Sequence, residues 1–110
     1  MIIKTPSSNP ARVNVRFELP PAIWADSVFL VGDFNQWNEA SHPMTRGRND
    51  PTWSISLELD RDKTYEFRYL VNGREWHNDW NADGYAPNPY GGTNSVVSTV
   101  GAPTVQRKRS

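Results

Sequence analysis

Residues 64–73 read Thr64-Tyr65-Glu66-Phe67-Arg68-Tyr69-Leu70-Val71-Asn72-Gly73. Apolar or aromatic side chains stand at every second position from residue 65 to residue 71, and a period of two is typical of a β-strand with one buried face. Asn72-Gly73 is a strong hairpin signal, because a type I′ turn needs positive φ angles at both central residues. This segment therefore predicts a strand that turns back on itself, with residues 74–78 as the return strand.

Strand patterns also occur in five other segments, residues 13–19, 27–32, 42–46, 53–59 and 94–100. The first alternates strictly and ends at Pro20-Pro21, because proline cannot donate to a β-ladder. Residues 27–32 predict a strand buried on both faces, and residues 42–46 predict a short edge strand. No segment has a convincing helical period of 3.6 residues. The chain is therefore expected to be all-β, an antiparallel β-sandwich of about seven strands.

The chain has 110 residues, which is the size of one domain. We expect a flexible arm over residues 1–11, the sandwich over residues 12–100, and a flexible basic tail over residues 101–110. The N-terminus lacks an apolar stretch long enough for a signal peptide, and the longest apolar run, Val28–Val31, is far short of a membrane span. The expected location is therefore the cytoplasm, without membrane association.

Composition excludes several classes of protein and site. The absence of cysteine rules out a disulfide framework and Cys-based zinc sites, and two histidines, His42 and His77, are too few for a His-rich metal site. Twelve basic and twelve acidic residues give a formal net charge of zero. A neutral chain argues against a nucleic-acid partner, because that affinity rests on neutralising phosphates. We expect no metal and no cofactor.

The acidic residues do not predict a catalytic pair. A glycosidase needs two carboxyl groups that flank one bond in a cleft, whereas the acidic residues here fall mostly on turns or outward strand positions. The Gly-x-Ser-x-Gly motif of a hydrolase is absent, and Gly91-Gly92 is not followed by the lysine of a phosphate loop. We therefore expect no catalytic residues and a chain that is not an enzyme.

The five tryptophans are more informative. Trp53 heads an alternating strand and Trp24 follows the proline pair, so both are expected in the core or at its rim. Trp37 lies in the loop of residues 32–38, where Phe34 can serve as the apolar anchor. The local sequence favours equally an outward-facing Trp37 and one folded back over the sandwich edge. An exposed indole would indicate a partner, because exposure forfeits about 1.5–3 kcal/mol of burial.

A pyranose ring suits an exposed indole beside amides and a guanidinium group. Its face of C–H bonds matches an aromatic platform, and its hydroxyl rim needs the donors and acceptors that Asn, Gln, Arg and Lys side chains supply. A neutral sugar also requires no net charge. The residues thus favour a neutral polysaccharide over phosphate or lipid.

A family resemblance is carried by four segments, Val28–Asn38, Tyr65–Gly73, Trp76 with Asp79, and Gly91–Val97. The Gly-x-Phe-Asn-x-Trp run followed by Tyr-x-Phe-x-Tyr-x-Val-Asn-Gly resembles the family 48 carbohydrate-binding module. This early set domain is found at the N-terminus of glycogen branching enzymes and isoamylases and in the β subunit of the AMP-activated protein kinase. The resemblance spans about residues 12–100. It implies an immunoglobulin-like sandwich that binds α-glucan (glycogen, starch or maltooligosaccharide) without the family's catalytic barrel.

The resemblance also implies the binding residues, which are Trp37, Arg68, Trp76, Tyr90 and Asn94, with Thr93 and Trp80 as reserve candidates. In the kinase module, glucan stacks on two tryptophans beside a basic residue and an asparagine. Tyr90 stands where that module has leucine. Gly92 stands where it has threonine, so Thr93 would have to supply the lost hydroxyl.

The face of Trp76 depends on the preceding turn. A two-residue hairpin loop at Asn72-Gly73 pairs Tyr69 with Trp76 and places Trp76 on the core face. An extra loop residue or a bulge moves it to the face of Arg68. The family's tryptophan comes one residue sooner after the glycine, which implies such an insertion and favours the Arg68 face.

Two functions follow from the sequence. The first is a non-catalytic α-glucan-binding module. The alternative is a protein-interaction module that docks a carbohydrate-metabolising enzyme or kinase complex without strong glucan binding of its own. The expected partner is an α-1,4-glucan polysaccharide or oligosaccharide, and the sequence leaves open whether a separate glycogen-metabolising enzyme is a further partner.

Overall fold

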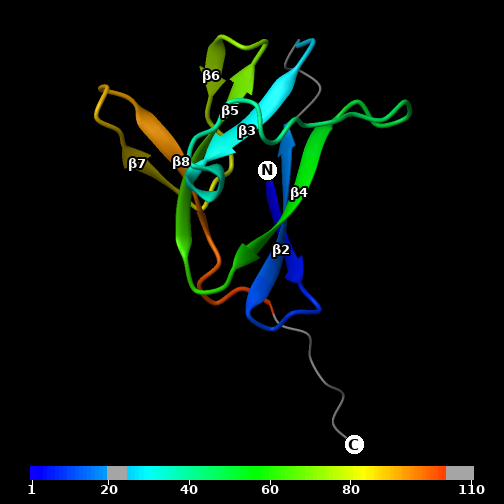
Figure 1. The fold of residues 1–110 in the computed structure, drawn as a ribbon, viewed down its shortest axis with the longest axis vertical. Coiled ribbons are helices and arrows are strands. Elements are labelled where there is room, and N and C mark those ends of the chain that lie inside the picture. Colours follow the sequence, from blue (N-terminus) through cyan, green and yellow to red (C-terminus); the bar gives the residue numbers. More distant parts are fainter. Residues whose placement is uncertain (20–24, 104–110) are drawn as a thin grey trace, which may run out of the picture.

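Two antiparallel β-sheets face each other in the computed structural model, which describes residues 1–19 and 25–103 (Figure 1). The first sheet has the order β1-β2-β4, with β1 at Ile2–Pro6, β2 at Arg12–Leu19 and β4 at Trp53–Asp60. The second has the order β3-β5-β8-β7, with β3 at Val28–Gly32, β5 at Thr64–Val71, β7 at Gly84–Pro87 and β8 at Thr93–Ser98. In this sheet β6, at Glu75–His77, also pairs with β5. The expectation of an all-β, immunoglobulin-like sandwich is confirmed.

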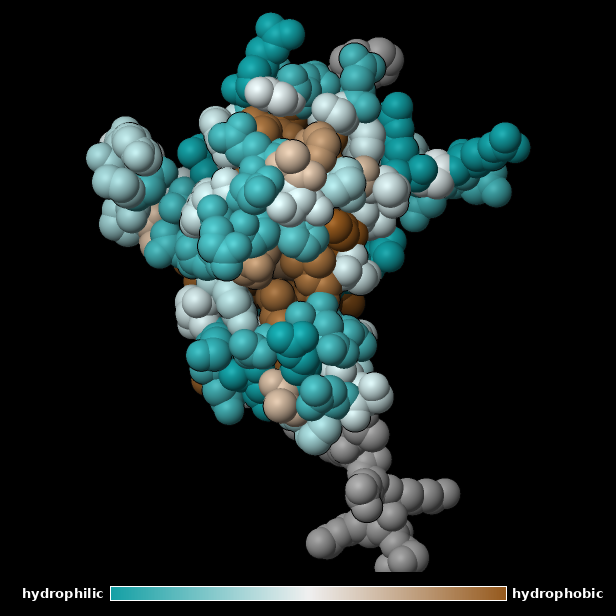
Figure 2. Space-filling view, in the orientation of Figure 1, coloured by the Kyte–Doolittle hydropathy of each residue, from teal (hydrophilic) through white to brown (hydrophobic). Residues whose placement is uncertain are grey.

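The hydrophobic core lies between the sheets because alternate residues of their strands point inward. In β2, Val13, Val15, Phe17 and Leu19 are 0–1% exposed, and the residues between them are half-buried. The second sheet contributes Phe67, whose ring centroid lies 5.0 Å from that of Phe17 in an edge-on arrangement. Figure 2 shows hydrophobic residues mainly in the middle of one face, bordered by hydrophilic ones. Trp53 is also buried, as expected for a core tryptophan.

One buried polar pair ties β5 to the loop after β6. The Tyr69 hydroxyl donates to the Asp79 carboxylate over 2.6 Å, and both side chains are buried. Burial, followed by the neighbouring Asp79 charge, raises the pKa of the Tyr69 hydroxyl well above its usual value. The hydroxyl therefore keeps its proton and satisfies the buried carboxylate. The same carboxylate accepts a hydrogen bond from the Met1 ammonium group over 2.7 Å, so Asp79 connects β5, the loop after β6 and residue 1.

The structure corrects three expectations about chain ends and edges. Residues 2–6 are not a loose arm, because β1 pairs with β2 from Ile2↔Phe17 to Pro6↔Val13 and satisfies an otherwise open strand edge. The 42–46 segment forms only two isolated bridges, Phe29↔Pro43 and Thr45↔Ser54, which connect it to β3 and β4. β7, at Gly84–Pro87, lies outside all the segments in which the sequence predicted a strand. Trp24 and most of the expected basic tail lie outside the described residues.

The turn after β5 resolves the two alternatives for Trp76. Asn72 and Gly73 have φ angles of 54° and 72°, as the hairpin signal required. The register nevertheless pairs Val71 with Glu75 and Leu70 with Trp76, so the loop holds three residues rather than two. Because Leu70 and Arg68 share one face of β5, Trp76 lies on the face of Arg68.

Gly32 ends β3 at a point where no side chain fits. A Cβ atom there would lie 2.6 Å from the Glu66 carbonyl oxygen and 2.7 Å from Phe67 Cβ. We expect Gly32→Ala to lower the free energy of unfolding by about 1–3 kcal/mol, the usual cost of overpacking. Urea unfolding followed by tryptophan fluorescence measures this change. Gly84→Ala is the control, because its nearest neighbour would be 3.9 Å away, and equal midpoints for both variants would contradict the prediction.

Within residues 1–19 and 25–103, the only helix is the one-turn 3₁₀ helix η1 at Asp33–Asn35. No helix in these ranges is long and apolar enough to cross a membrane.

Candidate functional site

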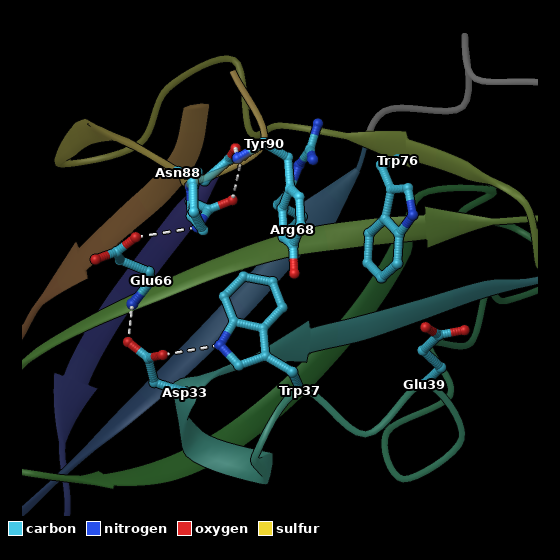
Figure 3. Close-up of a pocket in the computed structure, with 10 residues that line it drawn as sticks. Asp33, Trp37, Glu39, Glu66, Arg68, Trp76, Asn88 and Tyr90 are labelled. Carbon is cyan, nitrogen blue, oxygen red and sulfur yellow. Dashed lines mark hydrogen bonds between the residues drawn. The ribbon is translucent and has the colours of Figure 1, made fainter. Parts of the chain in front are cut away.

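An open groove of about 660 Å³ lies on the outer face of the second sheet (Figure 3). Phe67 and Tyr69 point from β5 into the core, so Glu66 and Arg68 project from the opposite face of the same strand. The lining residues are Asp33, Trp37, Glu39, Glu66, Arg68, Trp76, Asn88, Pro89, Tyr90 and Asn94. The structure therefore brings together all five principal residues that the resemblance implied.

Trp37 reaches the groove through an irregular turn after η1. Gln36 and Trp37 both have left-handed backbone conformations, with φ angles of 53° and 57°. The turn is anchored by the buried Asn35 amide, which bonds the backbone of Gly32 and Leu30. Phe34 packs against the core, with its ring centroid 5.7 Å from that of Phe17, as expected of the loop's apolar anchor. Trp37 itself is half-buried and faces the groove, so it is not folded back over the sandwich edge.

Arg68 and Trp76 lie next to each other on the floor of the groove. The Arg68 guanidinium carbon is 5.9 Å from the centroid of the Trp76 ring, at the outer limit of a cation–π contact. Trp76 is 37% exposed, so much of its indole remains open to a ligand. Arg68 Nε is buried and has no hydrogen-bond partner among residues 1–19 and 25–103. The two terminal nitrogens of the guanidinium group form no hydrogen bond or ion pair with these residues, so they are the donors that a ligand in the groove can reach.

A chain of four hydrogen bonds forms the polar wall of the groove. Asn88 Nδ2 donates to Asn94 Oδ1 over 3.3 Å, and Asn94 Nδ2 donates to Glu66 Oε1 over 3.0 Å. The backbone N–H of Glu66 donates to Asp33 Oδ2 over 2.7 Å, and the indole N–H of Trp37 donates to Asp33 Oδ1 over 2.9 Å (Figure 3). The wall therefore connects the β7–β8 hairpin, β5 and the η1 turn.

Tyr90 stands at the tip of the hairpin loop between β7 and β8. The Asn88 side-chain oxygen accepts hydrogen bonds from the backbone N–H groups of Tyr90 and Gly92 and so organises the loop. Tyr90 is 93% exposed and lines the groove beside Asn88. Its ring is free to lie along a ligand that occupies the groove.

The two reserve candidates do not line the groove. Thr93 is exposed, and its hydroxyl and carbonyl oxygens accept hydrogen bonds from Asn78 Nδ2. Trp80 is 67% exposed on the loop that follows β6. The hydroxyl that Gly92 lacks is therefore not supplied to the groove by Thr93.

Sequence reasoning missed five lining residues, Asp33, Glu39, Glu66, Asn88 and Pro89. A signal existed for Glu66, because it stands two positions before Arg68 and must share its face of β5. Asn88 and Pro89 could not be placed because the sequence did not predict β7, the strand that they follow. Asp33 and Glu39 reach the groove through the path of the η1 turn, which no periodic pattern encodes.

A β-sandwich with two indoles and an arginine around an open groove has the architecture of a carbohydrate-binding module. The family model of carbohydrate-binding module 48, the isoamylase N-terminal domain, matches residues 10–86. The chain belongs to this family.

Three curated relatives are 1,4-alpha-glucan branching enzymes. The one from Dictyostelium discoideum is 56% identical over 45 residues, which are 41% of this chain and 6% of that protein. The one from Novosphingobium aromaticivorans is 34% identical over 53 residues, with 44% of this chain and 7% of that protein covered. The one from Aquifex aeolicus is 39% identical over 57 residues, which are 47% of this chain and 9% of that protein. The similarity therefore spans less than a tenth of each relative.

Proposed function

We propose that this chain is a non-catalytic module that binds α-glucan in the groove of the second sheet. The observation that carries the proposal is the Arg68 guanidinium group, whose two terminal nitrogens form no hydrogen bond or ion pair with residues 1–19 and 25–103, and which lies beside Trp76 and across the groove from Trp37. Aromatic faces and free donors together are what a glucosyl unit needs, because its ring faces are apolar and its rim carries hydroxyl groups.

The polar wall supplies the acceptors of the proposed site. Glu66 Oε1 already accepts from Asn94, and Oε2 has no hydrogen-bond partner among the described residues 1–19 and 25–103. Arg68 donates and Glu66 accepts from adjacent positions on one face of β5, so neighbouring hydroxyls of one glucosyl unit can each find a complementary partner. The expected dissociation constant lies between about 1 µM and 1 mM.

The carboxylates of the groove support binding rather than hydrolysis. Both oxygens of Asp33 accept internal hydrogen bonds, one oxygen of Glu66 is held by Asn94, and Glu39, the third carboxylate of the groove, is exposed. A glycosidase instead needs two carboxyl groups that flank one bond inside a cleft. We therefore propose that the module binds glucan as it is and leaves its bonds intact.

An NMR titration with maltoheptaose tests both the binding and its place. We expect the backbone and indole N–H signals of Trp37, Arg68, Trp76 and Tyr90 to shift with one saturation curve. A β-1,4-linked oligomer of the same length is the control ligand and is expected to shift them far less. A flat maltoheptaose titration would overturn the proposal and favour the alternative of a module that docks a carbohydrate-metabolising enzyme.

A further inference from the structure

We propose that Asp33 is a positioning residue that holds the Trp37 indole in the orientation a sugar ring requires. The inference rests on the proposed function of the groove. Asp33 Oδ1 accepts the indole N–H of Trp37 over 2.9 Å, and Asp33 Oδ2 accepts the backbone N–H of Glu66 over 2.7 Å (Figure 3). One carboxylate thus joins the indole directly to the backbone of the strand that carries Arg68.

Trp37 needs such a contact because core packing does not hold it. Its backbone and that of Gln36 are left-handed, in a turn that follows a single turn of 3₁₀ helix. The side chain is half-buried and is not part of the core cluster. An indole in this setting can rotate about its side-chain bonds unless a directional contact selects one rotamer.

Asp33 is itself held in place by the end of a strand. Residues 67–71 of β5 pair with β3, and Glu66 lies one residue beyond the last of these pairs. Its N–H would lack a strand partner on that side, and the Asp33 carboxylate takes this place. The position of the indole is therefore set by the geometry of the sheet rather than by the turn alone.

The two contacts require a carboxylate. An ionised aspartate offers two acceptor oxygens, whereas asparagine offers one acceptor and one donor. Asp33→Asn would place an N–H group against either the indole N–H or the Glu66 N–H. Asp33→Ala removes both contacts. We expect both variants to release the indole, and Asp33→Ala to release it more completely.

The first test needs no ligand. We expect the indole N–H signal of Trp37 to exchange with solvent faster in Asp33→Ala than in the wild type. The exposed Asp26 provides the matched control Asp26→Ala, in which the signal stays as in the wild type. An unchanged Trp37 signal in Asp33→Ala would overturn the proposal, whether or not the chain binds glucan.

The second test is a mutant cycle on maltoheptaose affinity. We expect Asp33→Ala to weaken maltoheptaose binding about tenfold when Trp37 is present. In a Trp37→Phe background, which keeps an aromatic ring but has no indole N–H, the same change should weaken binding less than twofold. Equal losses in both backgrounds would show that Asp33 acts independently of Trp37 and would overturn the proposal. A wild type that does not bind maltoheptaose would instead overturn the proposed function, and the exchange test would still decide the role of Asp33.

Discussion

Replacing Trp37 with alanine is expected to weaken maltooligosaccharide binding at least tenfold, and to abolish it if the wild type binds only weakly, while the fold stays intact. Trp37 is one of the two indoles that line the groove and is not part of the core cluster. Losing the burial of one aromatic face against a sugar ring costs about 1.5–3 kcal/mol, which is a factor of about 10 to 100 in affinity. A dissociation constant that starts at about 1 µM would therefore rise to about 10–100 µM, and one that starts at about 1 mM would rise beyond calorimetric detection.

Trp80→Ala is the matched control for Trp37→Ala. Trp80 is also a loop tryptophan, but it is 67% exposed and lies outside the groove. We expect its removal to leave maltoheptaose affinity within about twofold of the wild type. Isothermal calorimetry measures both affinities, and urea unfolding shows that both variants are folded. Wild-type affinity in Trp37→Ala would rule out Trp37 as a platform.

Replacing Phe67 with alanine is expected to lower the free energy of unfolding by about 3–5 kcal/mol, the usual cost of emptying a buried phenylalanine site. Phe67 has no exposed surface and lies at the centre of the aromatic core, with Phe17 and Tyr69 ring centroids at 5.0 and 5.6 Å. Such a loss is a large part of the stability of a domain of this size. Denaturant unfolding measures it, and Phe67→Leu, which fills more of the space, should cost clearly less.

Replacing the neighbouring residue, Arg68, should lower ligand affinity rather than stability. Arg68 stands next to Phe67 on β5 but lines the groove, where its guanidinium group forms no hydrogen bond or ion pair with residues 1–19 and 25–103. Arg68→Ala is therefore expected to weaken maltoheptaose binding at least tenfold, because a ligand oxygen loses a charged donor. Its unfolding midpoint should stay close to that of the wild type. A large loss of stability without a loss of affinity would show that Arg68 serves the fold instead.

The long strands could be predicted because each carries its own pattern. The alternation in β2 and β5 states which side chains are buried without reference to any other part of the chain. The two short edge strands β1 and β7 were missed for the opposite reason. Each is at most five residues long and forms because the adjacent long strand offers an open edge. That edge is not visible in the segment itself.

The candidate site also has a part that the sequence indicated and a part that only the structure revealed. Trp37, Arg68, Trp76, Tyr90 and Asn94 were implied by a family resemblance and do line one groove. The polar wall that links them was not anticipated. Asp33 and Asn88 belong to it because a one-turn helix and a hairpin loop bring their side chains to β5 and β8. Hydrogen bonds between such segments depend on the path of the backbone, which a one-dimensional pattern does not contain.

Trp76 shows where sequence reasoning ends and tertiary structure takes over. The amino-acid sequence alone predicted a strand, a turn with positive φ angles at Asn72 and Gly73, and a return strand. These follow from side-chain alternation and from backbone sterics, which are local properties. Only the folded pairing of Leu70 with Trp76 placed the indole in the groove. A shift of one residue in an antiparallel pair moves every side chain of the return strand to the other face. The pairing in the assembled sheet therefore decided the register of β6, and with it the face on which Trp76 lies.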